Sequence, residues 1–311
     1  MTDDPSPSAF RVAHARAAHQ LLERERVFGD SYAIAVLGSK AAAELLLDPT
    51  IHNNTSARSF RAGIVARSRY AEDCLLKAIA KRTKRYAVIG AGLDAWALRA
   101  AWVLPEIQTF ELDYPAMVQW KRELYKRNGW RSIPGLTWVA NDLLESTSID
   151  ALERCSATFS EPFFLSALGV FVYLPMSCVE HQLAALRRLA VGSSIVLDYR
   201  VDDALLNPLA RIIMQQTACI MASGGEHWLS SSCPEKMQDL LQQVGFRVQE
   251  DIGPRELNAR YFKHRRDGFQ IAGEGFRHLI AVKEDWELPF IFWQSYTFNN
   301  VHYQTQWQLL S

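Results

Sequence analysis

The chain has 311 residues, enough for one large α/β domain or two small ones with a substantial core. Its 34 basic and 34 acidic side chains balance, which disfavours a nucleic-acid partner because such binding depends on excess Lys and Arg. Five scattered cysteines without a Cys-x-x-Cys spacing predict reduced cytoplasmic thiols with no disulfide framework or metal site, and we expect neither a signal peptide nor a membrane span.

In the first part of the chain, before any predicted strand, apolar residues recur at the spacing of a helix. It predicts helices over residues 9–26, 40–47 and 64–81. Because these helices come before the first predicted strand, we expect residues 1–63 to form a helical cap over the sheet or the cofactor.

Strands and helices then alternate. Apolar runs predict strands at Arg85–Gly90, Ile107–Asp113, Leu136–Ala140, Pro162–Val170, Ser194–Tyr199, from Gly245, and at His278–Lys283. Helical patterns lie at 94–104, 115–127, 176–189, 202–222 and 234–244. The alternation predicts an α/β fold with a doubly wound, mostly parallel, seven-stranded Rossmann-like sheet and right-handed crossovers.

The same pattern divides the chain into further regions. We expect a cofactor-binding core over residues 64–200 and a substrate lid, inserted after strand five, over 201–232. Residues 233–285 complete the sheet, and the aromatic tail 286–311 fits no element.

The first strand runs directly into a glycine turn, Gly90-Ala91-Gly92. Glycine lets the backbone approach a ligand that a Cβ would block. The second strand ends in Asp113, about 20 residues further on, where a carboxylate suits a ribose hydroxyl pair. This layout predicts a nucleoside-containing cofactor across the carboxyl ends of the strands.

Asp94 helps to choose between cofactors. Ala95 stands where a dinucleotide fingerprint has its third glycine, and the fingerprint tolerates alanine there. A carboxylate at Asp94 would repel a pyrophosphate, but it could accept a hydrogen bond from an ammonium group. S-adenosylmethionine, which has an ammonium, a sulfonium and no phosphate, is therefore the better fit, and a nucleotide-dependent oxidoreductase is the weaker alternative.

Five segments in order resemble the class I S-adenosylmethionine-dependent methyltransferases of the leucine carboxyl methyltransferase type. The resemblance covers roughly residues 10–285, and many bacterial members serve small-molecule or secondary metabolism. Two departures are Ala95-Trp96, where the family usually has Thr-Arg, and Leu168, where some members have a Glu near the cofactor. The segments are Ala66–Tyr70, Val88–Asp94, Phe110–Pro115 with Trp120–Glu123, Leu168–Val170 with Val172–Leu174, and Gly224–Glu226 with Trp228.

The resemblance implies that Arg67 binds the methionine carboxylate of the cofactor, for which a planar guanidinium is well suited. Asp113 is expected to accept the ribose hydroxyls, and Asp142 to accept the adenine amino proton while the amide of Leu143 contacts the ring. The other cofactor-binding candidates follow strand ends and are Gly90, Ala91, Gly92, Asp94, Tyr114, Leu168 and Gly169.

The acceptor is less defined by the sequence. Candidates around it are Arg69, Tyr173, Tyr199, Glu226, Trp228 and Tyr261. A carboxylate acceptor is already ionised near pH 7 and needs no general base, whereas a phenol would benefit from His227 beside Glu226. Tyr173 and His227 are therefore the candidate catalytic residues.

We accordingly expect O-methylation of a carboxylate or phenol of a small molecule by a cytoplasmic monomer or homodimer. The competing interpretation is a catalytically silent cofactor-binding or scaffold protein on the same fold. Ala95, Trp96 and Leu168 are the residues that support this alternative.

Overall fold

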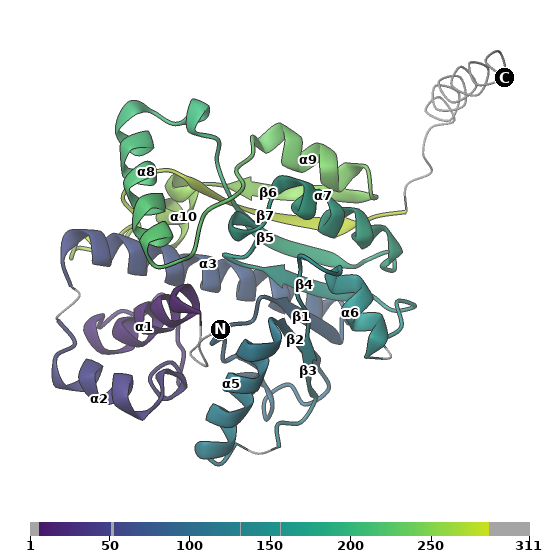
Figure 1. Cartoon of the computed structure of the whole chain (residues 1–311), viewed down its shortest axis with the longest axis horizontal. Coiled ribbons are helices and arrows are strands. Elements are labelled where there is room, and N and C mark those ends of the chain that lie inside the picture. The colour runs from purple at the N-terminus through teal and green to yellow at the C-terminus, as the bar shows by residue number, and fades with distance from the viewer. Residues whose placement is uncertain (1–5, 51–52, 131, 156, 286–311) are drawn as a thin grey trace, which may run out of the picture.

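The computed structural model describes residues 6–50, 53–130, 132–155 and 157–285 (Figure 1). Within them, seven strands form a single sheet in the order β3-β2-β1-β4-β5-β7-β6. β7 is antiparallel to both its neighbours, and the other pairings are parallel. The predicted doubly wound, mostly parallel sheet is confirmed. The strands are β1 Arg85–Ile89, β2 Gln108–Asp113, β3 Leu136–Ala140, β4 Phe163–Ala167, β5 Ser194–Arg200, β6 Phe246–Ile252 and β7 Phe276–Lys283.

Position in the sheet explains the two kinds of strand sequence. The central strands β1 and β4 are covered on both faces and are therefore almost continuously apolar, and every residue of β4 is buried. β6 lies at the sheet edge, where buried and more exposed side chains alternate.

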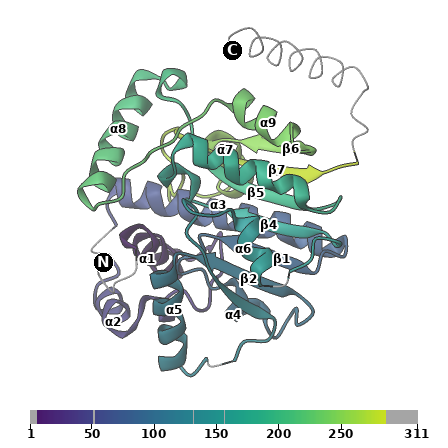
Figure 2. The same ribbon diagram turned by 45° about the vertical axis from the view of Figure 1, so that its right-hand side comes forward.

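Helices cover both faces of the sheet (Figures 1 and 2). Side chains of α6, α7 and α9 form one hydrophobic core with the strands, and those of α3, α4 and α10 form a second core. A third cluster joins α1 and α2 to α5 beside β2 and β3. The helices are α1 Pro7–Leu22, α2 Ser39–Leu47, α3 Thr55–Ala80, α4 Trp96–Ala100, α5 Pro115–Arg127, α6 Ser148–Arg154, α7 Met176–Ala185, α8 Pro208–Ser223, α9 Pro234–Gln242 and α10 Pro254–Tyr261.

Some helix bounds differ from the sequence-based predictions. α5 has the predicted bounds, but α3 begins earlier than predicted because Asn54 caps it by accepting a hydrogen bond from the Ala57 amide at 2.9 Å. The predicted division between residues 63 and 64 therefore lies inside a helix. α6 and α10 were not predicted, since each is too short for helical periodicity to be clear.

α8 lies outside the repeating strand–helix pattern, as expected for the predicted lid. Asn207 caps its start, and its other end leads into a turn through Gly224 and Gly225. That end meets α1: the Ser6 hydroxyl donates to Glu226 at 2.5 Å, and the Arg11 guanidinium contacts the sulfur of Met221. The predicted tail 286–311 lies outside the described residues.

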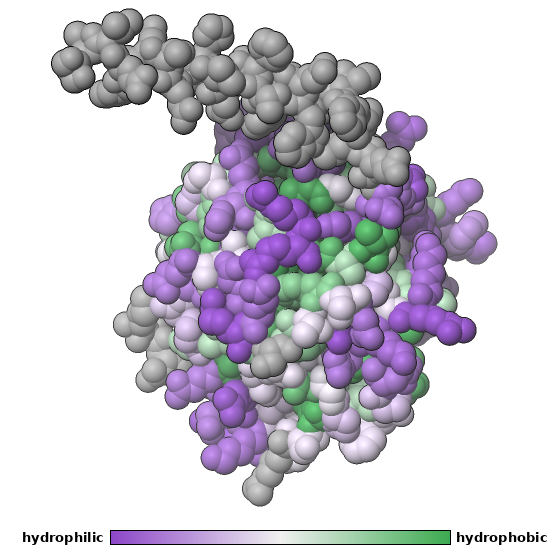
Figure 3. Space-filling model, turned by 90° about the vertical axis from the view of Figure 1, so that its right-hand side faces the viewer, coloured by the Kyte–Doolittle hydropathy of each residue, from purple (hydrophilic) through white to green (hydrophobic). Residues whose placement is uncertain are grey.

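The surface is mixed in character. Figure 3 shows one face, on which hydrophilic residues dominate and smaller hydrophobic areas lie between them. In the part of the chain that the structure describes, no helix combines the length and apolar character that crossing a bilayer requires.

Candidate functional site

The glycine turn after β1 is shaped by close backbone packing. Gly90 and Gly92 both have positive φ, at 66° and 48°. A Cβ at Gly90 would collide with the side chain of Val170, which lies in the loop after the neighbouring strand β4. The turn and this loop therefore meet at the carboxyl edge of the sheet, where α/β proteins bind their ligands.

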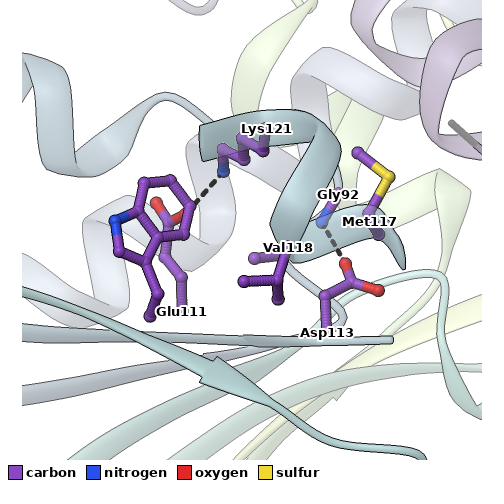
Figure 4. A pocket seen from close by; sticks show the side chains of 8 residues that line it. Gly92, Glu111, Asp113, Met117, Val118 and Lys121 are labelled. Carbon is purple, nitrogen blue, oxygen red and sulfur yellow. Dashed lines mark hydrogen bonds and ion pairs between the residues drawn. The ribbon is translucent and has the colours of Figure 1, made fainter. Parts of the chain in front are cut away.

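Asp113 ends β2 at the same edge. One carboxylate oxygen accepts the Gly92 amide at 2.6 Å, and the other accepts the Tyr114 amide at 2.7 Å. Burial raises the pKa of Asp113, while these two amides and the charge of Lys121 act to lower it. The two amides orient the carboxylate, and Figure 4 shows the bond to the Gly92 amide in the glycine turn. Each oxygen keeps a lone pair for a further donor.

Arg67 reaches from α3 to the loop after β4. Its Nη1 lies 3.0 Å from Oδ2 of Asp198, and Oδ1 of Asp198 accepts the Gly169 amide at 2.6 Å. Gly169 has a φ of 66°, and a Cβ there would lie 2.7 Å from Nη1 of Arg67. The structure thus brings Arg67 and Gly169 together, while their contacts with the cofactor stay predictions.

Asp198, which joins them, was not among the predicted site residues. It is buried in β5, directly after the apolar run Ile195–Leu197. A carboxylate in a strand buried on both faces needs a partner. The position of Asp198 in such an apolar strand could therefore have indicated from the sequence that it pairs with a cation.

Asp94 has protein partners for both carboxylate oxygens. Oδ1 accepts the Trp96 amide at 2.7 Å, and Oδ2 pairs with Nη1 of Arg16 at 3.0 Å. Burial acts to raise its pKa, but the charges of Arg16, Lys121 and Arg99 outweigh burial and the pKa is lowered. Asp94 is therefore ionised and links α1 to the start of α4, and its contact with a cofactor ammonium stays a prediction.

The loop after β3 is fixed to its neighbours. The Asn141 amide donates to the Asp113 carbonyl at 2.8 Å, and Asp142 accepts the Leu144 amide at 2.9 Å. The Leu143 carbonyl accepts from Gln182 of α7 at 2.9 Å. Asp142 and Leu143 thus lie next to the end of β2, while their contacts with adenine stay predictions.

The loop after β4 and the turn after α8 are held together. The Leu229 amide donates to the Val172 carbonyl at 2.7 Å, and the Ser230 hydroxyl donates to the Phe171 carbonyl at 2.8 Å. These bonds place the segment that carries Tyr173 beside the turn that carries Glu226, His227 and Trp228. The Trp228 ring packs edge-on against Phe276, with ring centroids 5.3 Å apart.

Three predicted acceptor residues have their polar atoms engaged within the fold. Arg69 Nε lies 2.8 Å from Asp73, which also accepts from the Tyr261 hydroxyl at 2.9 Å. The Tyr199 hydroxyl donates to Asp251 at 2.7 Å, and burial with this hydrogen bond raises the Tyr199 pKa. The roles of Arg69, Tyr199 and Tyr261 in acceptor binding stay predictions.

Comparison with known proteins identifies the fold and its chemistry. The profile of the family described as leucine carboxyl methyltransferase matches residues 9–187. This chain belongs to that family. As a member, it is a methyltransferase, and S-adenosyl-L-methionine is its methyl donor, as expected from the sequence. The alternative of a nucleotide-dependent oxidoreductase is thereby set aside.

Relatives agree with this assignment. YktD of Bacillus subtilis, named as a candidate S-adenosyl-L-methionine-dependent methyltransferase, is 29% identical over 222 residues, 71% of this chain and 72% of YktD. A candidate methyltransferase of the same kind from Mycobacteroides abscessus is 28% identical over 209 residues, 66% of this chain and 68% of its own. The crystal structure of a candidate methyltransferase from Thermobifida fusca shares the fold, with a TM-score of 0.58 at 17% identity over 91% of this chain and 96% of its own.

The residues at the carboxyl edge of this methyltransferase fit its cofactor. Asp113 presents an acceptor oriented by two amides, and Arg67 presents a guanidinium beside Gly169. A hydroxyl pair suits the first of these groups, and a carboxylate suits the second. When bound, the cofactor supplies a methyl group made electrophilic by its sulfonium.

Proposed function

We propose that this methyltransferase transfers a methyl group to a carboxylate oxygen of a small-molecule acceptor. The observation that carries the proposal is the state of the two candidate bases. His227 is exposed, and neither His227 nor Tyr173 makes a side-chain hydrogen bond to a carboxylate among the described residues. An ionised carboxylate acceptor needs no such base, and the family is named for carboxyl methylation.

In this proposal the protein contributes position and a dry site. Arg67 binds the methionine carboxylate, Asp113 holds the ribose hydroxyls and Asp142 accepts from the adenine amino group. The 224–230 turn, fixed to the loop after β4, excludes water and orients the acceptor beside Tyr173.

A phenol is the second candidate acceptor, favoured by the position of His227 next to Glu226 on this turn. The two acceptors predict different pH profiles. Turnover of a carboxylate acceptor should be nearly constant between about pH 6 and 8, whereas turnover of a phenol should rise with pH over this range, because the phenol itself must lose its proton.

The experiment is a screen of small carboxylic acids and phenols with methyl-labelled S-adenosylmethionine. Labelled esters that hydrolyse in mild base would support the proposal. Base-stable ethers would favour the phenol, and binding of the cofactor without turnover across the panel would favour the catalytically silent alternative.

We also propose a cytoplasmic location and a role in bacterial secondary metabolism, with the protein a monomer or homodimer. All five cysteines are free thiols, which suits a reducing compartment. Size-exclusion chromatography with light scattering would determine the oligomeric state.

A further inference from the structure

A buried ion pair lies directly behind Asp113. Glu111 precedes Asp113 by two positions on β2, so both side chains point to the same face of the sheet. Nζ of Lys121, from α5, lies 2.6 Å from Oε2 of Glu111, and each residue is 1% exposed. Figure 4 shows the Lys121 ammonium directed from the helix toward the Glu111 carboxylate, with Asp113 further along the same strand.

The pair lines a narrow crevice that is too tight to admit a water molecule, and Gly92, Asp113 and Trp138 also line it. The Lys121 ammonium lies 5.6 Å from the centre of the Trp138 ring. Oε1 of Glu111 is buried without a hydrogen-bond partner among the described residues. The charges of this pair are therefore shielded from water.

Stability alone does not account for such a pair. Burying two charges costs several kcal/mol each, and apolar residues of similar size often stabilise a fold as well or better. Lys121 does act on its surroundings: its charge opposes the rise in the Asp113 pKa that burial causes, and it contributes to the lowered pKa of Asp94. It is also fixed to the strand whose last residue is Asp113, by a helix that begins two residues after it.

We propose that Lys121 is a positioning residue for cofactor binding, held by Glu111 on the strand that ends in Asp113. The charge of Lys121 opposes the rise in the Asp113 pKa that burial causes, and the ion pair fixes α5 against the end of β2. The other charges around this cluster are Asp94 on the loop after β1, with Arg16 of α1 and Arg99 of α4. The inference rests on the proposed ribose-binding role of Asp113.

The test replaces both partners by methionine, which removes the charges without leaving one unpaired. We expect the Glu111→Met/Lys121→Met variant to fold, and to bind S-adenosylhomocysteine about tenfold more weakly than wild type at pH 6, with a smaller deficit at pH 8. The deficit shrinks because a higher pH ionises Asp113 without help from Lys121. Calorimetric titration at both pH values measures this, and wild-type affinity at both would overturn the inference.

A matched control comes from another buried pair. Arg61 and Glu23 lie 2.7 Å apart with side chains 2% and 3% exposed. Replacing both by methionine should leave the pH dependence of affinity unchanged. If that control reproduced the pH-dependent deficit, the effect would be a general consequence of losing a buried pair and the inference would fall.

Two further variants separate the possible failures. Asp113→Asn should itself weaken binding, and unchanged affinity there would overturn the ribose role on which the inference rests. If Asp113→Asn weakens binding but the double variant does not, the inference about Lys121 alone fails. Should the double variant not fold, Lys121→Arg is compared with Lys121→Gln: near-wild-type affinity of the arginine variant and about tenfold loss in the glutamine variant support the inference, and equal affinities overturn it.

Discussion

Gly169 shows how the absence of a side chain can position another residue. Its positive φ turns the backbone after β4, and its amide binds Asp198 while the Arg67 guanidinium lies against its Cα. The space that a Cβ would fill is therefore occupied by the group expected to bind the cofactor carboxylate. Position 169 therefore favours glycine for two reasons: its φ is positive, and a Cβ would collide with the Arg67 guanidinium.

Gly169→Ala should consequently affect binding more than folding. The positive φ costs about 1 kcal/mol for alanine, and the new methyl group must displace Arg67. We expect affinity for S-adenosylhomocysteine to fall about tenfold, measured by calorimetry.

Gly225 provides the control, because its φ is 81° but nothing lies within 4 Å of a Cβ built there. Gly225→Ala should carry a similar backbone cost without the loss of affinity. Equal affinity losses in the two alanine variants would show that the clash with Arg67 does not matter.

At the scale of elements, α1 and the turn after α8 close over the same edge of the sheet. Ala9 of α1 lies near Gly92, and a Cβ at Gly92 would be 3.2 Å from the Ala9 Cβ. The Ser6 hydroxyl at the start of α1 donates to Glu226 on the turn. The start of α1 and the turn after α8 are thus joined by a hydrogen bond to a charged group.

Because this contact closes the edge, weakening it should speed cofactor exchange. Ser6→Gly removes the hydroxyl but largely retains helix capping, and a hydrogen bond to a charged group is worth about 1.5–3 kcal/mol. We expect association and dissociation rates of S-adenosylhomocysteine to rise about tenfold in stopped-flow measurements, with little change in the dissociation constant.

Glu226→Gln should move both rates in the same direction by less, because the amide oxygen can still accept from Ser6. Rates that stay at the wild-type values in both variants would mean that the cofactor enters without separation of α1 from the turn.

At the scale of the whole molecule, two buried titratable groups make stability depend on pH in opposite directions. Burial raises the Glu111 pKa to about 7 from its ordinary 4.5, with Lys121 acting against it. Burial lowers the His278 pKa to about 4 from 6.5. Glu111 therefore contributes stability that is lost as pH rises from 4.5 through 7, and His278 contributes stability that is lost as pH falls from 6.5 through 4.

Variants that lack either group should reveal its contribution to the pH dependence of the free energy of unfolding. Relative to wild type, the free energy of unfolding of Glu111→Gln should rise by about 3 kcal/mol between pH 4.5 and 7. That of His278→Gln should fall by about as much, relative to wild type, between pH 4 and 6.5. Urea unfolding at intervals of pH measures both differences, and differences that do not vary with pH would contradict the prediction.

Much of the fold and part of the site could be predicted from the sequence because local patterns carry them. All seven strands overlap the predicted ranges, and the central ones were the clearest because strands buried on both faces must be apolar. The glycine turn and Asp113 were likewise predictable, because a turn needs its glycines and the second predicted strand ends in the carboxylate of Asp113. Their spacing follows from one strand–helix–strand unit.

Tertiary structure alone decided which distant residues meet. Asp198 joins Arg67 to Gly169 across two strands and a helix, and Lys121 finds Glu111 between a helix and a strand. Local periodicity does not encode such pairs, because each depends on how separate elements pack. The sequence alone determined the sheet and the edge at which the glycine turn and Asp113 lie. Packing of the tertiary structure determined which charged residues surround that edge. The reason is that a buried charge is costly unless it has a partner, and packing decides which partner it meets.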